Sequence, residues 1–360
     1  MSIPEKMYGM VLTGHGGLDC LEWRTDLDVP KLGDAEVLIR VGASSVNNTD
    51  INTRIAWYSK AVRGATSSGA VSGSAEAEAD DSSWSGQPIR FPLVQGADCC
   101  GEIVAAGVDV AGSRIGERVL VRALQSSDSP DKAASGAFQA VTYGSEIDGA
   151  FAQFTKARSH DALAVQSDWS DIELASIPCA YSTAEGMLQR IGLREEHVLV
   201  TGASGGVGAA AIQLAKRRGA HITAMTSADK ADAVRAIGAD EIIARDAPLA
   251  EDTFDAVVDL VAGLRWPEMI ASLRRGGRYV AAGAIAGPIV ELDVRTLYLR
   301  DLTLFGTTFQ SDNILPDVIR YIEGGEIKPL ISQTFDLKDL GSAQEAFIGK
   351  SHIGKIGIRV

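Results

Sequence analysis

The sequence lacks several features that would place the protein in other classes. No run of apolar residues reaches the length of about 18 that a membrane-spanning helix requires. Four cysteines in 360 residues are too few for a disulfide framework, and the N-terminal MSIPEKMYGM has no secretory-signal layout, so we expect a cytoplasmic protein. Basic residues are in the minority, 34 against 47 acidic ones, and the net charge of −13 argues against nucleic-acid or anionic-membrane partners.

The remaining composition is ordinary for a globular protein, with 46% hydrophobic and 22% charged residues. The chain is long enough for two domains, because single hydrophobic cores rarely exceed about 250–300 residues. Residues 1–157 have the pattern of a mainly β domain, with short β-rich runs such as Met7–Thr13 and Glu36–Val46.

Two polar segments interrupt this first domain. Between Ala61 and Asp80, 13 of 20 residues are Gly, Ala or Ser without periodicity, which indicates either a structureless surface loop or a lid over a site. A second polar loop, LQSSDSPDKAASGA, covers residues 124–137. Neither segment carries a recognisable pattern, so the sequence does not reveal how they would shape a substrate pocket.

From Ile172 onward strands alternate with helices, and residues 158–308 are predicted to form an α/β, doubly wound parallel sheet. IELASIPCAYSTAEGMLQRIG and PEMIASLRRGG are expected to be helices. Residues 309–360 add a helix near Leu315–Gly324 and a final strand, KIGIRV, and we expect this tail to return to the first domain. The expected strands of the parallel sheet are HVLVTG, HITAMTS, EIIAR, FDAVVDLVAG, RYVAAGA and LTLFGTT.

The strongest chemical signal is the stretch HVLVTGASGGVGAAAIQLAKRRG at residues 197–219. An apolar strand runs into a glycine-rich turn and then directly into an alanine-rich helix. Such a turn lets the backbone approach a pyrophosphate, which binds to the free N–H groups and the positive dipole end of the helix. We therefore predict a dinucleotide site with positive φ at Gly205, built from Gly202, Ala203, Ser204, Gly205, Gly206, Val207 and Gly208.

The end of the second strand distinguishes the two nicotinamide cofactors. An NAD enzyme usually has an acid about 20 residues past the turn, where it binds the ribose 2′-OH. Here Thr226 and Ser227 are followed by Asp229 and Lys230, and small hydroxyls with a cation suit a 2′-phosphate. We expect NADPH to be preferred over NADH, with the alternative that Lys230 is only a solvated helix residue.

The spacing of the glycine turn resembles that of the medium-chain dehydrogenase/reductase superfamily, in its zinc-free, quinone oxidoreductase-like branch. The resemblance covers nearly the whole chain, including FPLVQGADCCGEIVAAG, DGAFAQF, ASIPCAYSTA, FDAVVDLVAG and HIGKIGI. It implies a GroES-like, barrel-like domain beside a Rossmann domain. It also implies that Lys230 and Arg245 bind the 2′-phosphate, that Thr183 lies behind the nicotinamide ring, and that the segment holding Asn47 lies against the ring.

Zinc-dependent members of this superfamily hold their catalytic ion with a Cys, a His and a second Cys. At the matching places this chain has Asn47, Ala97 and Cys179, and a single soft ligand predicts no metal. Cys99 and Cys100 are adjacent on a strand and should point to opposite faces. None of the five histidines has metal-ligand spacing to another along the sequence, and Asp98 is expected to be a structural hydrogen-bonding residue.

Without a Lewis acid, a hydride-transfer enzyme must stabilise negative charge on oxygen with positioned hydrogen bonds. Conjugated carbonyl compounds are the easier substrates, and zinc-free members of the superfamily reduce quinones and α,β-unsaturated ketones or aldehydes. The catalytic candidates are Tyr58, Asn47 and Asn52, with Tyr58 as the main donor. The resemblance implies a structural role for Asp50. The alternative function is an NADPH-binding protein with a structural or regulatory role and little turnover.

The last expected strand of the parallel sheet bears on assembly. Leu302–Gly306 is an apolar sheet edge, and an exposed edge of that kind is usually covered or paired. Members of the superfamily often pair at this edge. We therefore expect a homodimer.

Overall fold

The alternating segment from residue 197 onward folds into a six-stranded parallel sheet in the computed structural model, which describes residues 3–126 and 140–360. The strand order is β13-β12-β11-β14-β15-β16, so the order reverses direction between β11 and β14, as in dinucleotide-binding folds. This confirms the doubly wound, Rossmann-type prediction. The strands are β11 (His197–Val200), β12 (His221–Met225), β13 (Glu241–Ile243), β14 (Phe254–Asp259), β15 (Leu273–Ala281) and β16 (Thr303–Gly306).

The helices of this half differ from the prediction in three places. The helix expected over PEMIASLRRGG ends at Ala271, and the residues from Leu273 onward open β15. The helix expected from Ile172 is split, because Pro178 has no N–H and begins a new helix. Helix α9 was not predicted. The helices are α4 (Asp171–Leu174), α5 (Pro178–Arg190), α6 (Gly206–Arg217), α7 (Ala231–Ala236), α8 (Trp266–Ala271) and α9 (Val294–Leu299).

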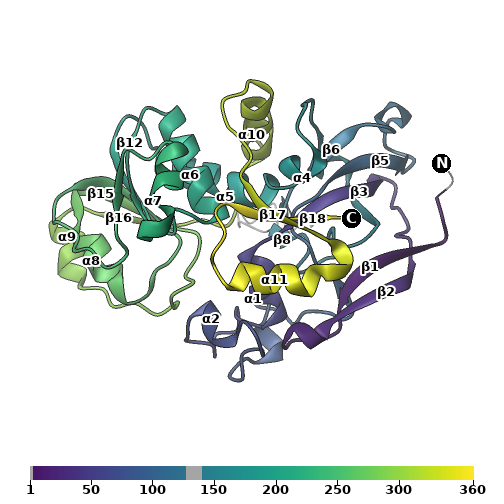
Figure 1. Cartoon of the computed structure of the whole chain (residues 1–360), viewed down its shortest axis with the longest axis horizontal. Helices are drawn as coiled ribbons and strands as arrows, with labels where there is room; N and C mark the ends of the chain where they lie inside the picture. The colour runs from purple at the N-terminus through teal and green to yellow at the C-terminus, as the bar shows by residue number, and fades with distance from the viewer. Residues whose placement is uncertain (1–2, 127–139) are drawn as a thin grey trace.

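The first part of the chain is mainly β, as predicted, and lies on the other side of the molecule from the parallel sheet (Figure 1). Its largest sheet has the order β10-β6-β5-β3-β18-β17, with β9 also pairing β3, and a smaller sheet has the order β2-β1-β4. The elements are β1 (Lys6–Leu12), β2 (Leu21–Asp28), β3 (Glu36–Val46), α1 (Asn48–Arg54), α2 (Thr66–Gly69), β4 (Leu93–Val94), β5 (Cys100–Ala106), β6 (Arg118–Val121), β9 (Phe154–Arg158) and β10 (Ala162–Ala164).

The polar loop predicted at residues 124–137 begins as a strand. β7 (Leu124–Ser126) pairs antiparallel with β8 (Ala140–Thr142), and residues 127–139 lie outside the described part of the chain. Short 3₁₀ turns complete the local structure: η1 (Leu18–Cys20), η2 (Ala79–Asp81), η3 (Gly112–Arg114), η4 (Ser159–Asp161), η5 (Ala228–Lys230), η6 (Gly263–Arg265) and η7 (Leu337–Asp339).

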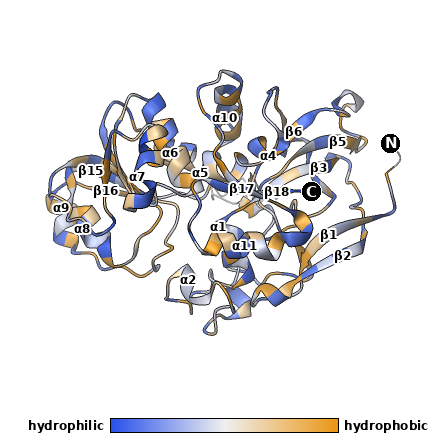
Figure 2. Ribbon diagram, viewed as in Figure 1, coloured by the Kyte–Doolittle hydropathy of each residue, from blue (hydrophilic) through white to orange (hydrophobic). Residues whose placement is uncertain are grey.

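The C-terminal segment contacts both halves. β17 (Ile331–Asp336) pairs with β18 (Lys355–Arg359), and β18 pairs antiparallel with β3, while α11 (Leu340–Ile348) packs beside them. α10 (Ile314–Glu323) instead buries its apolar face against α5 and α6 in the core of the Rossmann half. In Figure 2, α10 carries both hydrophobic and hydrophilic residues, as expected for a helix with one buried face. The domain boundaries at 157/158 and 308/309 remain predictions.

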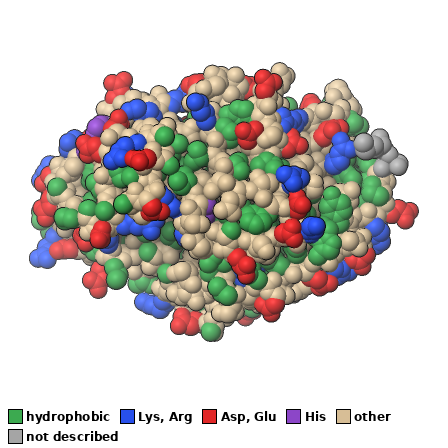
Figure 3. Space-filling model, in the orientation of Figure 1, with side chains coloured by type: hydrophobic (Ala, Val, Ile, Leu, Met, Phe, Trp, Pro, Cys, Tyr) green, Lys and Arg blue, Asp and Glu red, His purple; other side chains and the backbone are tan. Residues whose placement is uncertain are grey.

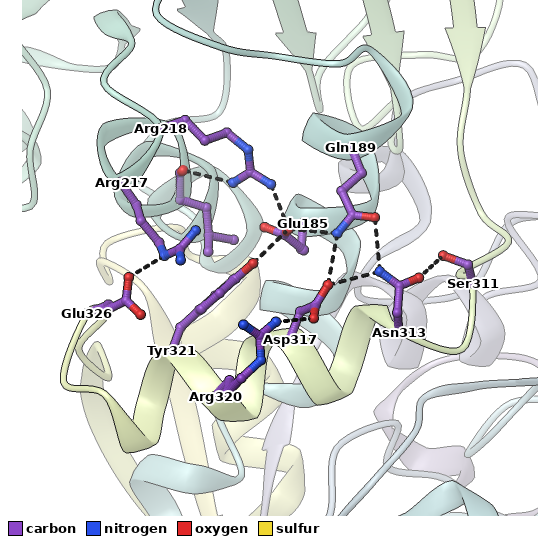
Figure 4. Close-up of polar contacts among 11 residues, drawn as sticks. Glu185, Gln189, Arg217, Arg218, Ser311, Asn313, Asp317, Arg320, Tyr321 and Glu326 are labelled. Atoms are coloured by element: carbon purple, nitrogen blue, oxygen red, sulfur yellow. Dashed lines mark hydrogen bonds and ion pairs between the residues drawn. The ribbon is translucent and has the colours of Figure 1, made fainter.

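A polar network fixes α10 to the Rossmann half (Figure 4). The buried Glu185 carboxylate of α5 accepts from Arg218, the residue after α6, at 2.6 Å and from the Tyr321 hydroxyl of α10 at 3.4 Å, and Arg217 pairs with Glu326 at 2.5 Å. The Arg217 guanidinium also lies 3.7 Å from the ring centroid of Tyr321 on α10. Because a buried carboxylate needs a counter-charge, Arg218 supplies it, and the Tyr321 hydroxyl connects α10 to the same carboxylate.

The glycine- and serine-rich segment of residues 61–80 is held against the rest of the molecule. Arg54, which is fully buried, donates to the carbonyl oxygen of Ala70 at 2.7 Å, and the N–H of Thr66 donates to the carbonyl oxygen of Ile285 at 3.1 Å. Since Ile285 belongs to the Rossmann half, the segment joins the two halves. Figure 3 shows acidic and basic side chains interspersed over the visible face. No helix in the described residues is both long and apolar enough to cross a membrane.

Candidate active site

The glycine turn between β11 and α6 lines a cleft of about 740 Å³ to which both halves of the chain contribute. Gly202 has a φ of 58° and Gly205 a φ of −80°, so the left-handed residue is Gly202, and the positive φ predicted at Gly205 is wrong. A Cβ on Gly208 would lie 2.2 Å from the Gly202 carbonyl oxygen, so the turn and the helix can approach this closely only with glycine there. A Cβ on Gly205 would make only an ordinary contact, 3.4 Å, with that oxygen.

These features fit the phosphates of a dinucleotide. The amino end of α6, a 12-residue helix, lies at the cleft, where its free N–H groups attract an anion. Three predicted residues do not line the cleft: Ala203 and Thr226 are buried, and Ser227 lies beside them. The predicted residues that line it are Thr183, Gly202, Ser204, Gly205, Gly206, Val207, Gly208, Lys230 and Arg245.

Cationic side chains gather where the cleft passes the end of β12. Lys230 is 5% exposed, and its Nζ donates to the carbonyl oxygens of Lys350 and His352, at 2.5 and 2.8 Å, so it is not a solvated helix residue. Arg245 and Lys350 line the same cleft. Burial, and then the Lys350 charge, lower the pKa of His352 to about 4, so this ring is neutral at pH 7. The local charge is therefore carried by the lysines and the arginine.

Asp98 is the centre of a buried hydrogen-bond cluster behind the cleft-lining residues Asn47, Cys179 and Lys355. Its Oδ1 accepts from the Cys179 N–H at 2.7 Å, and its Oδ2 accepts from Ser45 Oγ at 2.5 Å and from Asn47 Nδ2 at 2.8 Å. Lys355 Nζ pairs with the same Oδ2 at 2.9 Å and also donates to Asn47 Oδ1. The structural role predicted for Asp98 is thus accompanied by a buried ion pair.

Two of the three positions that match zinc ligands in zinc-dependent relatives, Asn47 and Cys179, meet at Asp98 in this cluster. Asn47 offers an amide that is already hydrogen-bonded, and burial followed by the Asp98 charge raises the pKa of the Cys179 thiol, which disfavours the thiolate. The Lys355 ammonium supplies a positive charge beside them. A catalytic zinc ion needs three converging deprotonated or neutral ligands and an open position, and this set does not fit it.

Lys355 has one hydrogen left for a ligand. Its Nζ carries three N–H groups, two of which are used by Asn47 and Asp98, and across residues 3–126 and 140–360 no third acceptor contacts it. Its side chain lines the cleft and passes directly over the glycine turn, because a Cβ on Gly206 would lie 2.6 Å from Lys355 Cδ. The ammonium is therefore fixed in place beside both the glycine turn and Asn47.

Asn47 immediately precedes α1, and its N–H donates to Asp50 Oδ2 at 2.7 Å, which is the structural role that the resemblance implied for Asp50. Both hydrogens of the Asn47 amide are used, one by the Ser45 carbonyl at 3.3 Å and one by Asp98. Asn47 therefore has no donor left for a substrate, and its predicted catalytic role changes to holding Lys355 in place.

Tyr58 and Asn52 line the cleft next to α1. The Tyr58 hydroxyl donates to Thr49 Oγ1 at 3.2 Å, and burial raises its pKa to about 12, so it stays protonated at neutral pH. Asn52 is 6% exposed, and its Oδ1 has no hydrogen-bond partner in the part of the chain described. Trp57 and Trp84 meet the Tyr58 ring edge-on at centroid distances of 5.8 and 5.5 Å. The result is an aromatic wall with two polar groups.

The remaining chemical candidates have structural contacts. The hydroxyl of Tyr143 hydrogen-bonds to Thr155 and that of Tyr181 to the Lys328 carbonyl, and neither residue lines the cleft. Cys99 and Cys100 are buried in different hydrophobic clusters, as expected for opposite faces of a strand. His197 and His221 do lie side by side, together with Glu241, although their sequence spacing gave no sign of it.

Comparisons with known proteins agree with this architecture. The model of the alcohol dehydrogenase GroES-like domain matches residues 33–167, and that of the zinc-binding dehydrogenase family matches residues 206–324. A chain from Sinorhizobium meliloti 1021, assigned as an alcohol dehydrogenase, has the same fold with a TM-score of 0.84 and 37% sequence identity. The match covers 99% of this chain and 97% of that one. The chain belongs to the medium-chain dehydrogenase/reductase superfamily.

Curated relatives place it within that superfamily. Acryloyl-coenzyme A reductase of Metallosphaera sedula is 28% identical over 278 residues, which cover 74% of this chain and 83% of the relative. Quinone-oxidoreductase QR1 of Triphysaria versicolor is 26% identical over an alignment 361 positions long, and the match covers 95% of each chain. The protein is an NAD(P)H-dependent oxidoreductase of the quinone oxidoreductase-like branch.

The sequence analysis did not identify Lys355, which lines the cleft and forms the buried ion pair with Asp98. A signal was available, because Lys355 stands in the terminal run KIGI of β18, whose four residues are all buried. Lysine is almost never fully buried without a partner, so a lysine in such a run predicts a buried acid elsewhere in the chain. Trp84 and Lys350 were also missed, and they lie in segments without a recognisable motif.

Proposed function

We propose that the protein reduces quinones or α,β-unsaturated carbonyl compounds by hydride transfer from NADPH, without a zinc ion. The observation that carries the proposal is the Lys355–Asp98–Asn47 cluster, which provides a fixed ammonium group beside two residues, Asn47 and Cys179, at positions that match zinc ligands in zinc-dependent relatives. The names of the relatives support it, because an acryloyl thioester and a quinone are both conjugated carbonyl compounds. When bound, the nicotinamide ring supplies the hydride.

The chain's own residues bind and orient the reacting oxygen. As a conjugated carbonyl gains negative charge, the third N–H of Lys355 and the hydroxyl of Tyr58 strengthen their hydrogen bonds to it. Trp57 and Trp84 offer flat apolar surfaces on which a planar conjugated substrate packs.

The preference for NADPH is proposed from the cations Lys230, Arg245 and Lys350 at the end of β12. The best test is Arg245→Ala, because Arg245 is exposed and its removal leaves the buried contacts of Lys230 intact. We expect the Kd of NADPH to rise about tenfold, close to 1.4 kcal/mol, with the Kd of NADH unchanged. Arg235→Ala on α7, which does not line the cleft, is the matched control. Equal losses for the two cofactors would contradict the assignment.

We also propose a cytoplasmic homodimer. β16 is the edge of the parallel sheet, and the adjacent α9 exposes Val294, Tyr298 and Leu299, whose exposed fractions are 59, 60 and 56%. Exposed apolar residues beside an unpaired strand favour association. All four cysteines are free, which suits a reducing compartment. Light scattering at micromolar concentration should give twice the chain mass, and Leu299→Asp should shift it to the monomer. A monomeric wild type would contradict the proposal.

A substrate screen with an untagged, chelator-treated preparation tests the reaction itself. Enones, quinones, enoyl thioesters, saturated ketones and alcohols are compared by the oxidation or reduction of the nicotinamide. We expect turnover on the conjugated compounds that does not change when zinc is added. Alcohol oxidation that needs added zinc would contradict the proposal. Tight NADPH binding without turnover on any compound would favour the structural or regulatory alternative.

A further inference from the structure

Three potential metal ligands meet at the amino ends of β11, β12 and β13, the opposite end of the strands from the glycine turn. His197 and His221 are direct partners in the parallel pairing of β11 with β12. Glu241 opens β13 and is the register partner of Thr223, which stands two residues after His221. Because side chains alternate between the faces of a sheet, all three side chains project from the same face.

The distances are short enough for one ion. The three ligand atoms lie within 4.8 Å of one another, and His221 Nε2 lies 3.2 Å from Glu241 Oε1. Bonds of about 2.0–2.2 Å place the ligand atoms of a tetrahedral zinc site roughly 3.4 Å apart, so small side-chain rotations close the set. Thr223 Oγ1 contacts both His197 Nε2, at 2.8 Å, and Glu241 Oε2, at 3.3 Å, and holds them on either side of the site.

The surroundings favour a cation and leave it accessible. The His221 and Glu241 side chains are 50 and 57% exposed, so an ion from solution can reach them. Asp240 Oδ2 lies 3.8 Å from His221 Nδ1, and the other oxygen of this carboxylate pairs with Lys216 at 2.6 Å.

We propose that His197, His221 and Glu241 bind a zinc ion, with water completing the tetrahedron. Imidazole nitrogens with one carboxylate are a common zinc ligand set, and this set joins three neighbouring strands. The ion binds the folded chain only, because the three residues are adjacent only when the sheet is formed, and it therefore stabilises the fold. It lies away from the cleft and takes no part in hydride transfer.

Zinc titration of the untagged, chelator-treated full chain tests this proposal by calorimetry and by thermal unfolding. The wild type should bind one zinc ion and unfold at a higher temperature with zinc. His221→Ala should weaken binding at least about tenfold and Glu241→Gln several-fold, and both should lose most of the thermal shift. His160→Ala, which removes an exposed histidine elsewhere, should behave like the wild type.

A second control separates this site from the cleft. Cys179→Ser removes the only thiol of the Asn47–Asp98–Cys179 set and should leave zinc binding unchanged. Cobalt offers an independent readout, because a tetrahedral cobalt ion absorbs visible light strongly, and the band should be absent in His221→Ala. Absence of binding and of any thermal shift with millimolar zinc would overturn the proposal. Stoichiometric binding that survives His221→Ala but is lost in Cys179→Ser would also overturn it, by moving the ion to the cleft.

Discussion

Two clusters contain residues of the types that bind metals, and they lie at opposite ends of the strands of the parallel sheet. They differ in burial. Beside the glycine turn, the side chains of Asp98 and Lys355 are 0 and 4% exposed, and the chain supplies both charges. At the amino ends of the strands, the side chains of His221 and Glu241 are 50 and 57% exposed, and the chain supplies only ligands. A buried carboxylate needs a permanent counter-charge from the chain, whereas an exposed set of ligands is solvated and can take up an ion from solution.

Because of this difference, membership of the superfamily does not by itself tell which chemistry the cleft performs. A match to a zinc-binding dehydrogenase model does not fix where a metal binds, or whether it takes part in the reaction. In this chain an ammonium group lies beside Asn47 and Asp98 in the cleft, and we propose that the ion-binding cluster is instead the exposed one. Zinc found in a purified preparation would therefore need to be assigned by variants before it is given a catalytic role.

The largest effect is expected from removing the cation of the buried cluster. In Lys355→Met the Asp98 carboxylate keeps its burial but loses its counter-charge, and breaking such a pair costs about 3–5 kcal/mol. Denaturant unfolding should show this loss, and kcat with an enone should fall as well. Lys156→Met, which removes the partly exposed pair with Glu36, should change stability far less. Equal effects of the two variants would mean that burial does not distinguish them.

The second expected effect separates the two sides by function. In Gly205→Val the added methyl groups extend into the space that the cofactor phosphates need, while the backbone φ of −80° suits valine. We expect the Kd of NADPH to rise at least about 100-fold, with an unchanged unfolding temperature. Zinc binding at His197 and His221 should persist. Retention of NADPH affinity within a few-fold would show that the turn is not the phosphate site.

The third effect concerns a buried acid beside the first cluster. Burial raises the pKa of Asp50 from 3.8 to about 7. Between these pH values the folded chain holds a proton that the unfolded chain releases, so the Asp50 contribution to stability falls as pH rises from about 4 to about 7. Asp50→Asn keeps an oxygen for the Asn47 N–H and removes the titration.

The free energy of unfolding of Asp50→Asn, relative to the wild type, should therefore increase by about 4 kcal/mol across this interval and stay level above it. Matched urea titrations at several pH values measure the difference. Asp232→Asn on α7, which changes a fully exposed carboxylate, is the control. A difference between Asp50→Asn and the wild type that does not vary with pH would mean that Asp50 is ionised in the folded chain throughout.

The sequence was sufficient for features that depend on local order. The alternation of strands and helices gave the doubly wound sheet, and the glycine stretch at 202–208 gave a turn that does line the cleft. It was insufficient where partners are distant or paired by register. Lys355 and Asn47 are separated by 308 positions, and His197 meets His221 only because β11 and β12 pair in parallel. The positive φ was predicted at Gly205 but is found at Gly202. The sequence could not distinguish the two positions, because several glycines in one turn carry the same local signal.

The smallest effect, and the sharpest test of how the buried cluster works, is expected from Tyr58→Phe. The ring keeps its edge contacts with Trp57 and Trp84, so packing is preserved while the hydroxyl is lost. The hydroxyl donates to Thr49 without a substrate and lines the cleft that also holds the Lys355 ammonium. Because Lys355 carries a full charge and still has a free N–H, it should bear most of the charge that develops on the substrate oxygen.

We therefore expect kcat on an activated enone or quinone to fall about tenfold, close to 1.4 kcal/mol, with the Kd of NADPH unchanged. Deuterated NADPH should establish that hydride transfer limits the rate before the two enzymes are compared. Tyr8→Phe, at a partly buried position that does not line the cleft, is the matched control and should keep the wild-type kcat. An unchanged kcat in Tyr58→Phe would leave the ammonium as the sole donor. A loss larger than that of Lys355→Met would reverse the order, because the neutral phenol would then carry more of the developing charge than the buried cation.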